Sequence, residues 1–252
     1  MIYIYNEIEN DPGLDKLKFL IEKALKGNSA LIIKRGFKHL SFTNFENLMQ
    51  NKLGFFHDKR HYTLNSELTI SNWWSVRYNP EKDTSYTYSK TTQPLHIDNA
   101  WFSDPAELNL FCLEKQAVRG GENTFYPLDR LEEDLANEEP GLLNDLQKTE
   151  VLIQKGDGKY FNKTTILKND KIFWNFYRTE KSDSKVKVMC EEFFKFLNKK
   201  EKTSSVDVFR CETGDAFCFH DQKILHGRLK FEASKKDDRI LHQSMWKIKY
   251  NA

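Results

Sequence analysis

The sequence predicts a mainly β fold that is decorated by helices. Short runs of apolar, β-branched and aromatic residues gather in the middle and at the end of the chain, and segments with helical spacing are inserted between them. Because strands and helices do not alternate, this order argues against a βαβ chain. The 252 residues, 39% of them hydrophobic, can bury a substantial core. We expect one domain over residues 1–252, since no linker or low-complexity segment divides the chain.

Each element follows from a local pattern. Asp11 and Pro12 are typical of a helix start, and Gly27 follows the last residue at helical spacing. Pro140-Gly141 separates two short helices, and Gly214-Asp215 marks a turn between strands. In chain order we expect a helix over 11–27, a strand over 30–33, strands around an irregular stretch over 73–90, a strand over 108–113, helices within 127–147 and 186–197, and strands over 206–209, 216–219 and 240–248.

Composition excludes several classes of protein. Thirty-nine basic residues nearly balance 37 acidic ones, and the charges are interspersed, so we expect neither a nucleic acid nor a membrane as partner. The first ten residues do not resemble a signal peptide, which favours a cytoplasmic location. The four cysteines have no metal-binding or disulfide-like spacing and are expected to be buried free thiols.

One set of residues indicates metal chemistry. His96 and Asp98 are two residues apart, so in an extended chain both side chains point to the same side. A distant histidine such as His226 would complete the two-histidine, one-carboxylate arrangement that holds Fe(II) and leaves positions open. Alone, His-x-Asp is also compatible with a hydrogen-bonded surface turn. Arg239 follows His226 and could pair with a keto-acid carboxylate through its fork of donors, and Thr124 could add a hydroxyl donor.

These pieces resemble the taurine dioxygenase and clavaminate synthase-like family of Fe(II)- and 2-oxoglutarate-dependent oxygenases. The matching segments occur in family order between about Ala30 and Trp246. They are residues 30–37, Leu95-His96-Ile97-Asp98, Gly120-Gly121-Glu122-Asn123-Thr124, and Gly214-Asp215 through His226-Gly227-Arg228 to Arg239.

The resemblance implies a double-stranded β-helix, a jelly-roll core that encloses the iron. It implies that His96, Asp98 and His226 bind Fe(II), that Thr124 and Arg239 bind the cosubstrate 2-oxoglutarate, and that no further catalytic residue is needed. Related halogenases have a small residue at the position of Asp98, so a carboxylate there favours hydroxylation with release of succinate and CO2.

The substrate is less well defined. Many relatives carry a second arginine four residues after the first, aimed at an anionic group of the substrate, but this chain has Gln243. Gln243 could bind a neutral group, or Arg77, Arg178 or Arg228 could take the role of the arginine. Asn99 and Trp101, just after the ligand pair, are further candidates for contact with the substrate.

We therefore expect a hydroxylase that acts with O2 on a C–H bond of a small polar metabolite, such as a free or carrier-bound amino acid. Desaturation, ring closure and cleavage could use the same site. A non-catalytic metal- or ligand-binding β-helix protein and an oxygenase acting on a protein side chain stay open as alternatives. The sequence does not indicate an oligomeric state.

Overall fold

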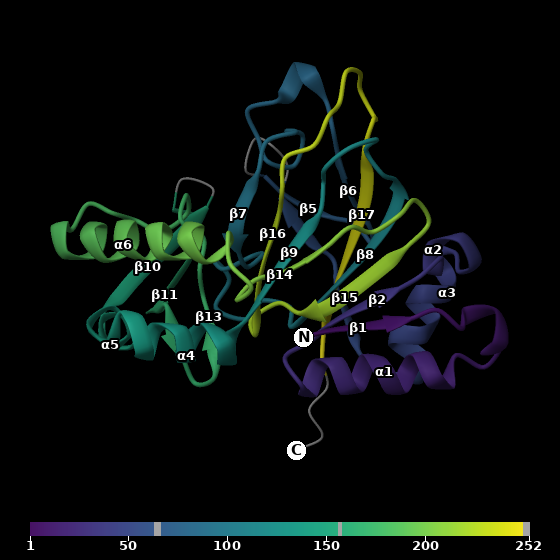
Figure 1. Ribbon diagram of the computed structural model, residues 1–252, viewed down its shortest axis with the longest axis horizontal. Helices are drawn as coiled ribbons and strands as arrows, with labels where there is room; N and C mark the ends of the chain where they lie inside the picture. The colour runs from purple at the N-terminus through teal and green to yellow at the C-terminus, as the bar shows by residue number, and fades with distance from the viewer. Residues whose placement is uncertain (63–66, 156–157, 249–252) are drawn as a thin grey trace.

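Two stacked β-sheets form the centre of the molecule, with helices on both outer sides (Figure 1). The computed structural model describes residues 1–62, 67–155 and 158–248. The prediction of a mainly β fold decorated by helices is confirmed. Among the described residues, no helix combines the length and the apolar character that a membrane span requires.

The larger sheet has seven strands in the order β1-β2-β15-β8-β17-β3. The strand β3 pairs with residues 245–247 of β17, and the seventh strand, β6, pairs with residues 240–243 of β17. Its central strand β8 begins with six buried residues in a row, because both faces of the sheet are covered. The strands are β1 (Ile2–Tyr5), β2 (Ala30–Ile33), β3 (Phe56–Asp58), β6 (Trp74–Arg77), β8 (Leu108–Lys115), β15 (Ala216–His220) and β17 (Ile240–Lys247).

The smaller sheet has four strands in the order β14-β9-β16-β7. They are β7 (Gln93–His96), β9 (Asn123–Pro127), β14 (Asp207–Phe209) and β16 (Ile224–Arg228). Three further pairs stand apart, formed by β4 (Arg60–Tyr62) with β5 (Leu68–Ile70), β10 (Glu150–Lys155) with β11 (Tyr160–Thr165), and β12 (Leu167–Lys168) with β13 (Lys171–Ile172).

The helices form two groups. The first packs on the outer face of the larger sheet, and its members are α1 (Asp15–Lys26), α2 (Gly36–His39), α3 (Phe42–Asn47), the 3-10 turn η1 (Ile8–Asn10) and the π-helical turn η2 (Leu48–Lys52). The second covers the outer face of the smaller sheet with α4 (Leu128–Glu138), α5 (Pro140–Lys148) and α6 (Ser184–Lys200). The 3-10 turn η3 (Pro80–Lys82) follows β6.

Aromatic side chains fill the space between the two sheets. Phe125 of the smaller sheet makes edge contacts with Phe217 and Phe219 of the larger sheet, at ring-centroid distances of 6.0 and 5.4 Å. Phe111 stacks on Phe217 at 4.8 Å. Such buried rings contribute much of the burial energy of a small core. They close one part of the space between the sheets and leave the remainder for the site.

Most expected elements are present, with shifted ends. The first helix begins at Asp15 rather than Asp11, but the Asp11 carboxylate accepts from the backbone N–H groups of Asp15 and Leu17 and so serves as its cap. The strand expected over 108–113 extends to Lys115, and the helix expected over 186–197 extends from Ser184 to Lys200. All four cysteines are free and buried, as expected.

Candidate active site

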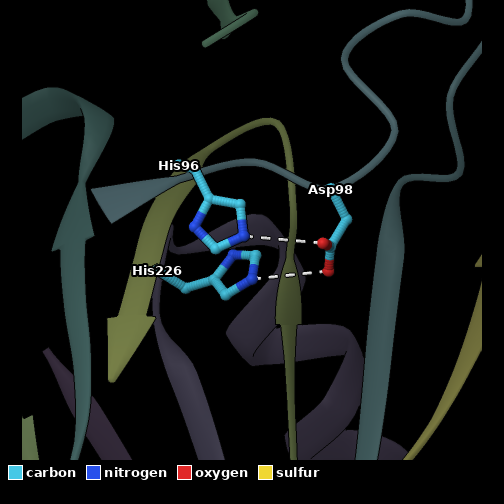
Figure 2. Close-up of side chains that lie close together, drawn as sticks. All are labelled: His96, Asp98 and His226. Atoms are coloured by element: carbon cyan, nitrogen blue, oxygen red, sulfur yellow. Dashed lines mark ion pairs between the residues drawn. The ribbon is translucent and has the colours of Figure 1, made fainter. Parts of the chain in front are cut away.

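His96, Asp98 and His226 lie together at one end of the smaller sheet. His96 ends β7, Asp98 follows two residues later, and His226 is paired with His96 on the neighbouring strand β16. One possible ligand atom from each residue lies within 4.8 Å of the other two. Figure 2 shows both imidazoles facing the Asp98 carboxylate, with Nε2 of His96 3.6 Å and Nε2 of His226 3.4 Å from its oxygens.

The other ring nitrogen of each histidine lies near an oxygen. Nδ1 of His96 is 2.9 Å from the carbonyl oxygen of Pro94, an acceptor, so Nδ1 carries the proton, and Nε2 accepts from the side-chain amide of Gln93 at 3.0 Å. Nδ1 of His226 lies 3.3 Å from the carboxylate of Asp221. Both arrangements direct Nε2 toward Asp98, as in metal sites where the second nitrogen of a histidine ligand is held by an oxygen.

The electrostatics of the cluster favour charged groups in spite of their burial. Burial raises the pKa of the Asp98 carboxyl, but the neighbouring His226 and His96 outweigh this and hold it well below its usual range. Burial lowers the pKa of His226, but Asp98 and Asp221 together raise it to about 9. A divalent cation would take the place of the imidazole proton that faces Asp98 and would neutralise the Asp98 carboxylate in the same way. The donor set therefore fits Fe(II).

A cavity, partly open to solvent, adjoins this cluster between the two sheets. Its lining of apolar, aromatic and a few polar or charged side chains is typical of small-molecule sites. Asp98 and His226 line it, and so do three buried or half-buried cationic side chains, Lys155, Arg228 and Arg239. The cavity therefore combines possible metal ligands with positive charge.

Arg239 immediately precedes β17 and is only 2% exposed. Its Nε donates to the side chain of Gln116 at 3.2 Å, whereas its buried Nη2 has no hydrogen-bond partner. Burial lowers the pKa of the guanidinium to about 10. A buried cation with an unused donor that lines a cavity is suited to the carboxylate of a ligand.

The structure does not bring Thr124 to this cavity, which corrects the expectation that its hydroxyl assists Arg239. Successive residues of a strand point to opposite faces, and on β9 it is Asn123 and Phe125 that line the cavity. Thr124 points to the other face, where its hydroxyl donates to Glu201 at 3.3 Å. Asn123 is 5% exposed and carries both a donor and an acceptor.

The candidates for substrate contact separate into two groups. Asn99, Trp101 and Gln243 line the cavity. Arg178 is exposed and is not among the lining residues. Arg77 forms an ion pair with Asp237 outside the cavity, at 3.4 Å.

The sequence analysis missed three candidate functional residues. Asp221 and Asn109 contact the possible metal ligands, and Lys155 lines the cavity with its Nζ 4.5 Å from the centroid of the Trp101 ring. Asn109 had a usable signal, because it is the one amide within the apolar run 108–113. A polar residue inside a buried strand needs a hydrogen-bond partner and often marks a site. Lys155 had no comparable signal in a chain with many lysines.

Comparisons with known proteins identify the family of the chain. Residues 14–245 match the model of the family described as taurine catabolism dioxygenase TauD, TfdA family. An asparagine oxygenase solved with Fe(II), 2S,3S-3-hydroxyasparagine and succinate has a TM-score of 0.70 at 12% identity, covering 91% of this chain and 78% of that one. The non-heme iron oxygenase OrfP, as a D157A mutant with (3S)-hydroxy-L-Arg, has a TM-score of 0.67 at 13% identity, covering 93% and 80%.

No curated protein sequence matches the chain. The structural neighbours share the fold at low identity, and the family model spans the segment that contains every candidate ligand. The chain therefore belongs to the TauD/TfdA family of Fe(II)- and 2-oxoglutarate-dependent oxygenases.

Proposed function

We propose that this protein hydroxylates a C–H bond of a free or carrier-bound amino acid or a similar small polar metabolite. The observation that carries the proposal is the convergence of His96, Asp98 and His226 beside a cavity that also contains the buried, partly unpartnered Arg239. Fe(II) and 2-oxoglutarate bound there would supply O2 activation, with release of succinate and CO2. The stacked sheets fit the double-stranded β-helix expected of one domain over residues 1–252, and a cytoplasmic location stays a prediction.

Three residues would hold the iron. Nε2 of His96 and Nε2 of His226 face the Asp98 carboxylate at 3.6 and 3.4 Å and would each bind the metal in the unprotonated form, and Asp98 would contribute an oxygen. Two nitrogens and one oxygen on one side of the metal leave the other side for cosubstrate and O2. Asp98 also fills the space that a chloride ion would need, which favours hydroxylation.

Two residues would hold the far carboxylate of 2-oxoglutarate. Arg239 would pair with it through Nη2, and the side-chain amide of Asn123, on the facing sheet, would donate a further hydrogen bond. Arg228 also lines the cavity: its Nη2 donates to the carbonyl oxygens of Ser89 and Thr91, and its buried Nε has no hydrogen-bond partner, so it contributes charge and one unused donor. Two buried cations in one cavity favour a dianionic cosubstrate.

The substrate would lie near Asn99, Trp101 and Lys155. Gln243 stands where many relatives have an arginine, but its amide nitrogen donates to Asp98 at 2.6 Å. Lys155 places a cation near Trp101 in the lining of the cavity. An ammonium group held over an indole ring can also pair with a carboxylate, which supports an amino acid as substrate. The asparagine- and arginine-derived ligands of the two structural neighbours support the same class.

The test is a screen of L-amino acids with Fe(II), 2-oxoglutarate and O2. We expect one or more compounds to stimulate succinate release and to gain one oxygen atom by mass analysis, and Asp98→Gly to abolish this product. If only a protein or a carrier-bound amino acid stimulates succinate release, that compound and not a free amino acid is the substrate. Binding of Fe(II) and 2-oxoglutarate by the parent chain without turnover of any of these substrates would favour a non-catalytic metal- or ligand-binding protein, and failure to bind them would overturn the proposal.

A further inference from the structure

Behind the candidate metal ligands lies a network of three polar side chains, Asp221, Asn109 and Gln243. Asp221 follows β15, Asn109 is on β8, and Gln243 is on β17. Each is at most 7% exposed. Burying three polar groups beside an aromatic core costs free energy unless each finds a partner. Their partners are each other and the ligands.

Asp221 contacts two ligands at once. Its carboxylate accepts the backbone N–H of Asp98, at 3.0 Å to one oxygen and 3.3 Å to the other. The same carboxylate lies 3.3 Å from Nδ1 of His226. It therefore holds the backbone that carries Asp98 and places a negative charge beside the His226 ring.

Asn109 and Gln243 act on the Asp98 side chain. The amide nitrogen of Asn109 donates to Oδ2 of Asp98 at 3.0 Å and to Oδ1 of Asp221 at 2.9 Å. The amide nitrogen of Gln243 donates to Oδ2 of Asp98 at 2.6 Å and to Oδ1 of Asn109 at 3.2 Å. Oδ2 thus has two N–H donors and also lies 3.4 Å from Nε2 of His226, whereas Oδ1 lies 3.6 Å from Nε2 of His96.

We propose that Asp221, Asn109 and Gln243 are positioning residues that set the orientation of Asp98 before the metal arrives. The inference rests on the proposed iron site and assigns Gln243 to the ligand rather than to the substrate. Asp221 holds the backbone of Asp98, and the donors of Asn109 and Gln243 limit the rotation of its carboxylate. Both carboxylate oxygens therefore keep facing the two imidazoles.

The experiment compares Asp221→Asn with Asp215→Asn. Asp215 is an equally buried carboxylate, 1% exposed, that accepts from Lys34, Arg35 and Glu212 in another part of the larger sheet. Both substitutions remove the charge of a buried carboxylate and should destabilise the fold to a similar degree. Only Asp221→Asn should weaken anaerobic Fe(II) binding, by about 10- to 100-fold, as is usual for residues that hold a metal ligand.

The second variant, Gln243→Leu, tests the orientation of the Asp98 carboxylate at a residue that lines the cavity. With Co(II) as a spectroscopic probe, we expect an altered visible absorption spectrum, because the carboxylate loses one of the two side-chain donors that limit its rotation. The melting temperature without metal serves as the control for folding.

The outcomes separate the two proposals. Parent-like metal affinity in Asp221→Asn together with a parent-like Co(II) spectrum in Gln243→Leu would overturn the positioning network and leave the iron site intact. An equal loss of affinity in Asp215→Asn would also overturn it, since the effect would then be one of general stability. If the parent chain binds neither Fe(II) nor Co(II), the proposed function itself fails.

Discussion

Substitution of Arg239 by methionine should maintain or raise the free energy of unfolding but weaken the binding of 2-oxoglutarate. The guanidinium is buried, and burial lowers its pKa from 12.5 to about 10. At about 1.4 kcal/mol for each pKa unit, this corresponds to a cost of about 3 kcal/mol for keeping the charge in the folded protein. The hydrogen bond to Gln116 and the contact with the Phe231 ring, 5.6 Å from the guanidinium carbon, offset about 2 kcal/mol of that cost.

Arg239→Met should therefore leave the free energy of unfolding unchanged or raise it by about 1 kcal/mol in the absence of 2-oxoglutarate. The same substitution removes one partner of a buried charge pair with the cosubstrate, which costs roughly 2–5 kcal/mol. Because about 1.4 kcal/mol is tenfold in affinity, the dissociation constant of 2-oxoglutarate should rise by roughly 30- to 3,000-fold. Arg239→Lys should weaken binding less, since it keeps the charge but loses the paired donors.

Two assays measure these effects. Urea unfolding without cosubstrate gives the stability of each variant. Anaerobic titration of the Fe(II)-loaded protein with 2-oxoglutarate gives the affinity through the visible charge-transfer band. In a thermal melt, 2-oxoglutarate at 100 times its dissociation constant should stabilise the parent by about 2.7 kcal/mol, or roughly 5–10 °C, and at the same concentration should shift the variant far less. Parent-like affinity in Arg239→Met, or a loss of more than about 2 kcal/mol of stability, would refute the reasoning.

Three further predictions concern other residues of the site. His96→Ala and His226→Ala should abolish tight Fe(II) binding while circular dichroism stays unchanged; retained turnover would contradict the ligand assignment. Asn123→Ala should raise the 2-oxoglutarate concentration needed for half-maximal turnover at least several-fold, whereas Thr124→Val should not; the reverse order would place the cosubstrate elsewhere. Burial, with a smaller effect of a nearby arginine, lowers the pKa of Lys155 to about 8, so the KM of a carboxylate substrate should rise above pH 8 as the ammonium loses its charge, and Lys155→Met should remove this dependence.

Much of the site could be predicted from sequence because its residues follow from chemistry and spacing. His96 and Asp98 are separated by two positions on an extended segment, and the structure places them on the same side. Their juxtaposition with His226 depends on the pairing of β7 with β16, more than a hundred residues apart, and no local pattern specifies that pairing. The family resemblance supplied it.

The error at Thr124 has a simple physical origin. Which of two successive strand residues faces the cavity depends on the register of β9 against β16, and a shift of one residue exchanges the two faces. The residue that follows the ligand, Gly227, pairs with Thr124 at this point, and a Cβ on Gly227 would lie 2.8 Å from the Thr124 hydroxyl. The sequence analysis chose Thr124, although Asn123 beside it also carries a hydrogen-bond donor.

The small hairpins and the polar network were less accessible to sequence reasoning. The hairpin of β10 and β11 alternates apolar and polar residues weakly, and our reading of the sequence missed Asp157-Gly158, a pair typical of hairpin turns, between its two strands. Asp221, in turn, is separated from Asp98 by 123 positions. Its role becomes visible only when the two sheets are stacked.

The proposed metal ligands and the proposed cosubstrate arginine belong to different sheets. His96 and His226 are on strands of the smaller sheet, while Arg239 leads into β17 of the larger one. A molecule bound at both ends therefore spans the interlayer space and opposes the transient separation of the two layers. The amide hydrogens of β7, β16 and β17 should then exchange with solvent as one cooperative unit when 2-oxoglutarate and metal are bound, and more independently when they are removed.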